Sequence, residues 1–494
     1  MTKKYLLPEE RGLISWNQVD QADYIYDVLQ SYSHSSVYPL HMPGHKRNTK
    51  KFGDALLYSL DMTESPHMVN LHDPSGLLKR HQEELAKDYG AANSYYMVNG
   101  STGGIISAIR TLTKRKDHLL MTRNAHRSTY HAMEICDLDA TFLSPEIDQE
   151  FGMYASISPK KVETLLDRDP KITCVFITSP TFEGVISDVR AIADVVHAHG
   201  ARLIVDEAHG AHFHYSHRYK DAIHEGADIV IESLHKTLPS LTATAVLHIS
   251  ERVDSEEMAR NLAIFETSSP SHLLLASCDE CIGYMRSEGA RDLDNMYRII
   301  DKVSHRLEGL EKLEVLGMGR DRKENHPLCY DMDPSKIIIS TKAVTVKGIE
   351  LNDILRQRGF ELEMGYGDYS LAMVTLGDTE EGLLRFADTL LEVDKELRYE
   401  AQPQESIFPE IPQKAMRLLD AWEGPGEFVR LEDSLGRIAN EYIWAYPPGI
   451  PLLIPGERIA QDILDRFLQL GKQRVKLKSS YGKAPAEIYV VKEG

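Results

Sequence analysis

The stretch Leu203-Ile204-Val205-Asp206-Glu207-Ala208-His209-Gly210 decides the fold class of this chain. An uninterrupted apolar run that ends in an acid and a glycine-containing turn is typical of a strand buried on both faces of a parallel sheet. In open α/β sheets, ligands bind beyond the carboxyl ends of such strands. Asp206 is therefore a candidate binding residue, although a helix cap, or a metal site that uses His209 and His212, would fit the same pattern.

Other short apolar runs alternate with helix-like patterns along the chain. We predict strands at residues 94–98, 118–122, 173–178, 202–205, 228–231 and 243–249. This alternation predicts a large, mostly parallel sheet that helices cover on both faces. A second, smaller α/β pattern is predicted from a strand at 336–341 and helices at 348–356 and 380–397.

We expect four parts along the chain. They are an N-terminal helical arm at 1–36, a large domain at 37–320, a small α/β domain at 321–400 and a C-terminal domain at 401–494.

Composition excludes several classes of protein. The 494 residues are 42% hydrophobic, which is enough to bury large cores. A formal net charge of −19 has the wrong sign for binding nucleic acid. The absence of a long apolar run predicts no membrane association and a cytoplasmic location. Cys278 and Cys281 form a C-x-x-C without a second pair inside a helix-like stretch, so we expect them to pack on a helix and expect no metal.

A glycine-rich turn, Asn99-Gly100-Ser101-Thr102-Gly103-Gly104, lies between a strand that ends near Val98 and a helix that we expect to begin near Ile105. Glycines such as Gly103 let the backbone approach an anion, while Ser101 and Thr102 add donors at a positive helix terminus. This turn predicts a phosphate site, but an ordinary capped helix start has the same sequence.

A third piece is Ser233-Leu234-His235-Lys236-Thr237, which also follows an apolar run. A lysine in such a turn can be desolvated, which lowers its pKa and suits it to form a Schiff base. Taken alone, Lys236 fits a surface loop better than a catalytic site. A phosphate cradle, then an acid at a strand end, then a lysine 30 residues later is what a pyridoxal 5'-phosphate (PLP) enzyme requires.

These pieces stand within a wider set of motifs, through which the sequence resembles the Orn/Lys/Arg decarboxylases of the PLP-dependent aspartate-aminotransferase-like fold. The matching segments are His41-Met42-Pro43-Gly44-His45-Lys46, Leu71-His72-Asp73-Pro74-Ser75-Gly76, 98–104, Arg123-Asn124-Ala125-His126-Arg127-Ser128, Thr178-Ser179-Pro180-Thr181, 205–212, 233–241, Thr267-Ser268-Ser269-Pro270-Ser271, 446–451 and Pro455-Gly456-Glu457.

The resemblance implies a role for each matched residue. Asp206 would pair with the pyridine nitrogen, and Lys236 would hold the aldehyde carbon. His126 would stack on the ring, and Thr181 would reach its 3'-oxygen. The phosphate and the underside of the cofactor would be contacted by Ser101, Thr102, Ser233 and His235, and by Ala208 and His209. Catalysis would rest on Lys236, His235, Asp206 and His126.

The same resemblance implies decarboxylation of lysine, ornithine or arginine, a place in polyamine biosynthesis, and a homodimer or dimer of dimers with interfacial active sites. A distal carboxylate should bind the cationic end of the substrate, and Glu457 is the candidate, although a capping or surface role fits it equally well.

Val69-Asn70 and Phe182 depart from the family pattern, which puts the substrate pocket in doubt. The alternatives are another PLP reaction, such as transamination or elimination, and a catalytically silent regulatory homologue.

Overall fold

The computed structural model describes residues 5–14, 19–37, 43, 46–65, 68–149, 151–316, 328–400, 408–446 and 449–493. It divides into two compact units, each assembled from segments that are distant in sequence. The first comprises Met1–Leu112 and Leu203–Asn295, and the second comprises Thr113–Arg202 and Met296–Gly494. Among the described residues, no helix has both the length and the apolar character that crossing a membrane requires.

The first unit is built around four strands. Strand β1 pairs antiparallel with β10, β10 pairs antiparallel with β9, and β9 pairs parallel with β8. Its main elements are α1 (Ile25–Ser33), α2 (Thr49–Phe52), α3 (Gly76–Tyr89), β1 (Asn93–Met97), α4 (Gly100–Leu112), β8 (Arg202–Asp206), β9 (Ile229–Glu232), α8 (Leu234–Thr237), β10 (Ala245–Ile249), α9 (Ser255–Phe265) and α10 (His272–Tyr284).

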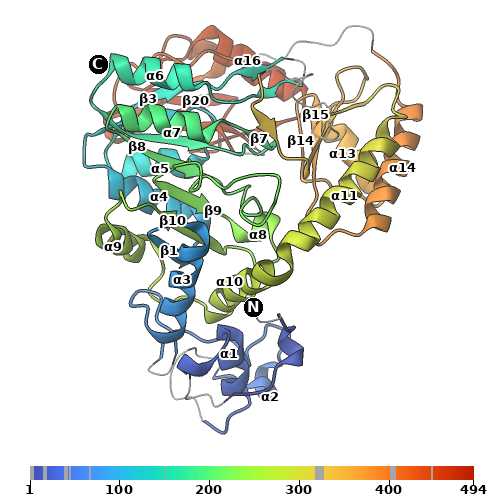
Figure 1. The fold of residues 1–494 in the computed structure, drawn as a ribbon. Helices are drawn as coiled ribbons and strands as arrows, with labels where there is room; N and C mark the ends of the chain where they lie inside the picture. Colours follow the sequence, from blue (N-terminus) through green and yellow to red (C-terminus); the bar gives the residue numbers. More distant parts are fainter. Residues whose placement is uncertain are drawn as a thin grey trace. The chain divides into compact units, whose positions relative to one another are not determined.

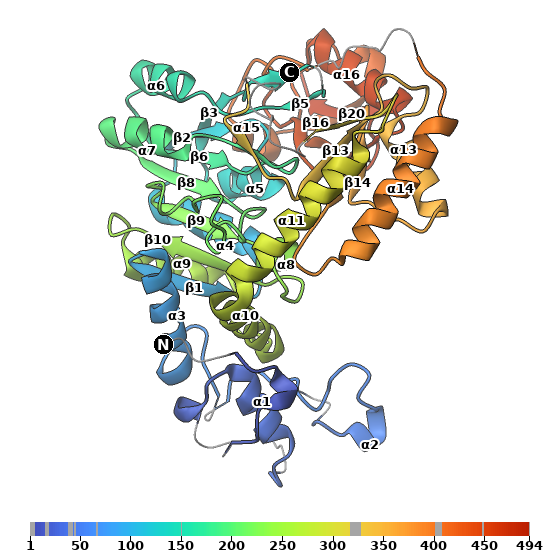
Figure 2. The same cartoon turned by 45° about the vertical axis from the view of Figure 1, so that its right-hand side comes forward.

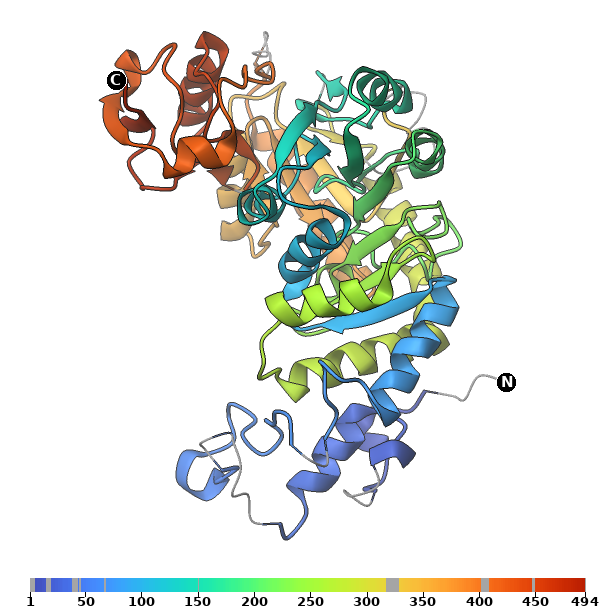
Figure 3. The ribbon, with the colours of Figure 1, turned by 90° about the vertical axis from the view of Figure 1, so that its left-hand side faces the viewer.

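Helices cover these strands because the strands are apolar along their length. Every residue of β9 and β10 is buried, as expected for strands with no face in water. Helix α4 contacts α9 and lies against β1, β9 and β10, while α3 and α10 contact β1 (Figures 1 and 3). Cys278 and Cys281 are buried on α10, so the expectation that they pack on a helix is confirmed.

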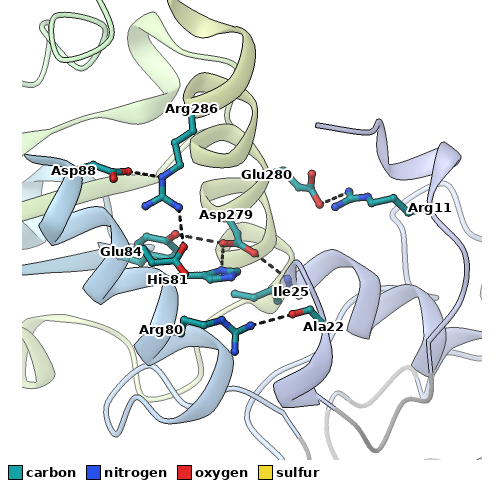
Figure 4. A network of polar contacts seen from close by, with 11 residues as sticks. Arg11, Ala22, Ile25, Arg80, His81, Glu84, Asp88, Asp279, Glu280 and Arg286 are labelled. Atoms are coloured by element: carbon teal, nitrogen blue, oxygen red, sulfur yellow. Dashed lines mark hydrogen bonds and ion pairs between the residues drawn. The ribbon is translucent and has the colours of Figure 1, made fainter. Parts of the chain in front are cut away.

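The N-terminal arm is fastened to this unit by polar contacts with α3 and α10 (Figure 4). Asp279 of α10 accepts a hydrogen bond from the backbone N–H of Ile25 at 2.9 Å, and its other oxygen lies 2.5 Å from His81 Nδ1. Arg11 forms an ion pair with Glu280, at 2.5 Å. Because Asp279 is buried, its contacts to the arm are shielded from water and fix where α1 begins.

The second unit holds several smaller sheets. Its main elements are β2 (His118–Thr122), α5 (Arg127–Ile135), β3 (Asp139–Leu143), α6 (Pro159–Arg168), β6 (Ile172–Thr178), β7 (Val185–Ile186), α7 (Val189–Ala198), β11 (Glu314–Leu316), β13 (Lys336–Ser340), α13 (Gly348–Gln357), β14 (Met364–Tyr366), β15 (Tyr369–Met373), α14 (Glu380–Glu396), α15 (Leu418–Glu423), β16 (Gly426–Arg430), β17 (Ile443–Tyr446), β18 (Pro451–Leu453), α16 (Gln461–Lys472), β19 (Lys476–Ser479) and β20 (Glu487–Val491). Helix α11 (Ala290–Leu307) begins in the first unit and continues into the second.

Parallel and antiparallel strands are segregated within this unit. Strand β2 pairs parallel with both β3 and β6. The antiparallel sheet β11-β13-β15-β14 is packed with α13, and the C-terminal part carries the sheets β16-β20 and β18-β17-β19. Helices α11 and α14 lie side by side, joined by ion pairs from Arg298 and Lys302 to Glu380 (Figures 1 and 2).

The expected fold class is confirmed, since most predicted strands and helices lie within two residues of the observed ones. The predicted helical arm contains α1, which begins at Ile25. The four-part domain division stays a prediction. The motif residues 41–42, 44–45 and 447–448 lie outside the described residues.

Candidate active site

Asp206 lies at the carboxyl end of β8, as the sequence predicted. Its side chain is buried, and one carboxylate oxygen accepts a hydrogen bond from the backbone N–H of Ala208 at 3.1 Å. Burial raises the pKa of Asp206, while the charge of Lys236 and the Ala208 hydrogen bond act in the opposite direction. An acid in this position needs a positive partner to remain ionised.

Lys236 reaches the same region from the neighbouring strand. Strands β8 and β9 are parallel, with Asp206 opposite Ile231, so the residues that follow them emerge at the same edge. Lys236 lies in the short helix α8 and is half-buried, with Nζ 3.2 Å from His209 Nε2. A half-buried amine within reach of both an acid and an imidazole is poised for proton exchange.

His235, next to Lys236, is held by the backbone. Its Nδ1 lies 2.9 Å from the carbonyl oxygen of Thr244. Because a carbonyl oxygen only accepts hydrogen bonds, Nδ1 carries a proton. In the neutral ring, Nε2 is then the unprotonated nitrogen, which can accept a hydrogen bond. The orientation of His235 is therefore fixed before any ligand binds.

The glycine-rich turn differs from the sequence expectation in one respect. Helix α4 begins at Gly100, not near Ile105, so Ser101 and Thr102 occupy its first turn. Gly100 makes this early start possible with φ of +67° and a hydrogen bond to the carbonyl of Ala243 at 2.8 Å. The hydroxyl of Ser101 lies 2.6 Å from that of Ser233, so two hydroxyls converge at a helix N-terminus. Thr102 is exposed.

Glycines allow close packing at the next turn of α4. A Cβ at Gly104 would lie 2.8 Å from the side chain of Met97 in β1 and 3.2 Å from Ile231 in β9. A Cβ at Gly103 would come within 3.3 Å of Asn99. These glycines let the N-terminus of α4 sit directly on the strands that carry the site.

Glu266 is a residue of this site that the sequence analysis missed. Its carboxylate accepts hydrogen bonds from the backbone N–H groups of Asn99 at 3.2 Å and Val98 at 3.4 Å. Burial raises the pKa of Glu266, while these two hydrogen bonds oppose the shift. Glu266 thus stabilises the turn before α4 through these two hydrogen bonds. It is at least 162 residues away in the sequence from the glycines of that turn. Its position just before the Thr-Ser-Ser-Pro-Ser motif is the signal that could have identified it.

Other predicted residues belong to the second unit. His126 is the N-cap of α5, where Nδ1 lies 2.8 Å from Ser128 Oγ and accepts from Ser128 N at 3.3 Å. Thr181 is buried, and its hydroxyl accepts a hydrogen bond from Val185 N at 3.2 Å. The roles of His126 and Thr181 stay predictions.

Glu457, the predicted distal anchor, has a partner that the sequence did not reveal. It is 1% exposed and forms an ion pair with Arg123 at 3.1 Å, while Ile454 N donates to the same oxygen at 3.0 Å. Burial raises the pKa of Glu457 to about 7, with the charge of Arg123 acting in the opposite direction. That Glu457 binds the substrate stays a prediction. Its ion pair with Arg123 also supports a structural role.

Comparison with known proteins gives two family matches. Residues 24–380 match the model of the Orn/Lys/Arg decarboxylase major domain, and residues 401–477 match that of the Orn/Lys/Arg decarboxylase C-terminal domain. The chain is 30% identical to an arginine decarboxylase of Bacillus subtilis, over 89% of this chain and 91% of that protein. It is 31% identical to an arginine decarboxylase of Halalkalibacterium halodurans, over 90% and 92% of the two chains.

Solved structures give the same fold. A lysine decarboxylase of Francisella novicida superposes with a TM-score of 0.81 at 18% identity, covering 95% of this chain and 81% of that one. The constitutive lysine decarboxylase of Escherichia coli superposes with a TM-score of 0.75 at 18% identity, covering 94% and 81%. The predicted fold is therefore confirmed.

Proposed function

The chain belongs to the Orn/Lys/Arg decarboxylase family, as its motifs predicted, and from this premise we propose arginine as the basic amino acid that it decarboxylates. One observation carries the choice of arginine. Four relatives named arginine decarboxylase are 28–31% identical over about nine tenths of this chain, whereas a lysine decarboxylase of Pseudomonas aeruginosa is 22% identical. The biodegradative arginine decarboxylase of Escherichia coli is more distant, at 23% identity over 56% of this chain.

The family's cofactor is PLP, and the residues of the first unit fit its chemistry. A phosphate requires donors at a helix N-terminus, which Ser101 and Ser233 supply with hydroxyls 2.6 Å apart. A pyridinium nitrogen requires a buried carboxylate, which Asp206 supplies. An aldehyde requires an amine that can lose its proton, which Lys236 supplies beside His209.

When bound, PLP supplies an electron sink for the carbanion that loss of the α-carboxylate leaves. We propose that Asp206 keeps a proton on the pyridine nitrogen, because a buried carboxylate is best stabilised by a positive partner. Lys236 Nζ exchanges a proton with His209 Nε2 and delivers one to the Cα of the product. His235 Nε2 is the alternative donor, since its Nδ1 is engaged by Thr244.

Three further proposals follow the family. We propose that the protein acts in the cytoplasm, that its amine product enters polyamine biosynthesis, and that two copies form a homodimer or a dimer of dimers with active sites at the interface. His126 would stack on the cofactor ring, and Thr181 would contact its 3'-oxygen.

The test is to incubate PLP-saturated protein separately with L-arginine, L-lysine and L-ornithine, and to measure CO2 and the matching amine. We expect the highest kcat/KM with arginine and no product from Lys236→Ala. A higher kcat/KM with lysine or ornithine would contradict the choice of arginine and leave decarboxylation intact. A keto acid without CO2 would instead identify transamination.

A further inference from the structure

The loop between β8 and β9 brings together three side chains that the proposed reaction does not use. His214 Nδ1 lies 2.8 Å from an oxygen of Asp221, and His224 Nδ1 lies 2.8 Å from the same oxygen. One ligand atom from each of these residues lies within 4.8 Å of the other two. Two imidazole nitrogens and a carboxylate thus converge on one point.

Asp221 is the inner, buried member of the three. Asp221 is 2% exposed, and the buried carboxyls of Glu207 and Glu232 lie near enough for its charge to raise their pKa values, although burial is the larger cause. Among the described residues, no lysine or arginine forms an ion pair with Asp221, Glu207 or Glu232. The raised pKa values favour protonated Glu207 and Glu232, so Asp221 is the ionised carboxylate here. A buried carboxylate whose partners are two imidazoles favours a nearby cation.

The three side chains are held in place by their surroundings. The ring of His214 stacks on Tyr89, with centroids 3.7 Å apart and planes 13° apart. Asp221 accepts a hydrogen bond from the backbone N–H of His224 at 3.0 Å. The side chain of His224 is 47% exposed, which leaves a route for a hydrated ion from solvent. The inner ligands are therefore oriented by their surroundings, and an ion can approach them from the side of His224.

We propose that His214 Nδ1, the carboxylate of Asp221 and His224 Nδ1 bind a divalent transition-metal ion of the zinc class. Two nitrogen ligands and one oxygen suit such an ion better than magnesium or calcium, which prefer oxygen. On binding, each Nδ1 gives up its hydrogen bond to Asp221 and donates its lone pair to the ion. Each Nδ1 proton leaves to solvent, Nε2 of each ring keeps or takes up one proton so that the imidazole is neutral, and water completes the coordination.

This site adds a metal that the sequence analysis did not expect, and its place in the fold indicates a stabilising role. Asp221 is followed by Ala222, whose backbone N–H donates to Glu207 at 3.0 Å, and Glu207 follows Asp206. An ion bound to Asp221 would therefore stabilise the loop that follows β8, next to Asp206, the proposed partner of the cofactor's pyridine nitrogen. The inference does not depend on the proposed substrate or reaction.

The test measures zinc directly on the full-length protein with PLP bound. Chelator-treated protein is equilibrated with Zn²⁺ and its zinc content is determined per chain. We expect about one tightly held ion in the wild type and a loss of affinity of about 100-fold in His224→Ala and in Asp221→Asn. The control is His199→Ala, because His199 lies 3.1 Å from Asp167 in an exposed histidine–aspartate pair. We expect it to bind zinc like the wild type.

Cobalt provides a second measurement that does not depend on activity. Co²⁺ at the site should give absorption bands above the range of the cofactor, and His224→Ala should lack them. Equal zinc content in the wild type and His224→Ala, or zinc that leaves when PLP is removed, would overturn the proposal. Because His224 is partly exposed, its replacement leaves the core intact, and circular dichroism verifies the fold of each variant.

Discussion

Several buried carboxylates of the described residues face a basic side chain, and one from each unit can be compared with the other. In the first unit Asp206 is near Lys236, and in the second unit Glu457 contacts Arg123. Burial raises the pKa of both acids, and the basic partner opposes the shift in both. The partners differ in what they can do, because lysine can lose its proton and react, whereas arginine keeps its charge. The first pair is therefore suited to chemistry and the second to holding the fold.

The largest expected effect tests the reactive half of this comparison. Lys236→Ala should lower kcat by about 10⁴-fold or more, because no other amine can replace the covalent link to the cofactor. The measurement is steady-state CO2 release with PLP in excess. Arg123→Lys is the matched control in the other pair, and a comparable loss of kcat there would remove the distinction between the two pairs.

Asp206→Asn should have the next largest effect, a fall in kcat of about 10³-fold. The amide keeps the size of the side chain but cannot hold a proton on the pyridine nitrogen. The change should spare PLP binding, which equilibrium dialysis would measure. Turnover within tenfold of the wild type would contradict the role assigned to this acid.

The sequence predicted the first pair better than the second. Asp206 and Lys236 follow apolar strands that can be recognised locally, and parallel pairing brings the ends of β8 and β9 to one edge. The contact between Arg123 and Glu457 spans 334 residues, and no local pattern reveals it. The contact between Glu266 and the turn before α4 is also long-range, and the only local sign of it is the position of Glu266 just before the Thr-Ser-Ser-Pro-Ser motif.

The helix boundary at Gly100 was missed for a different reason. Glycine disfavours helix interiors, so a run with three glycines indicated a loop. The structure instead places the run in the first turn of α4, where Gly100 takes a positive φ and Gly104 allows contact with Met97.

The smallest expected effect concerns the second pair and its pH dependence. The pKa of Glu457 is about 7 in the folded chain against an ordinary value of 4.5. A raised carboxyl pKa means that the stability this group contributes is fully present below about pH 4.5 and is lost as pH rises through about 7. The loss should amount to about 3 kcal/mol.

Glu457→Gln cannot titrate, so its stability should lack this decline. Urea unfolding midpoints of the wild type and the variant at pH 5 and pH 8 measure the difference, and Glu432→Gln on the surface is the control. If the two proteins lose stability in parallel, the pKa shift of Glu457 is refuted. A fall of more than tenfold in kcat/KM for arginine in Glu457→Gln would instead support a role of Glu457 in substrate binding.

The central claim is that the cofactor is held by Lys236. Borohydride reduction of the PLP-loaded protein, followed by proteolysis and mass spectrometry of the peptides, tests it most directly. We predict one pyridoxyl group per chain, on the peptide that contains Ser233-Leu234-His235-Lys236. A pyridoxyl group on another lysine, or unmodified Lys236 in a protein that still decarboxylates its substrate, would contradict the assignment.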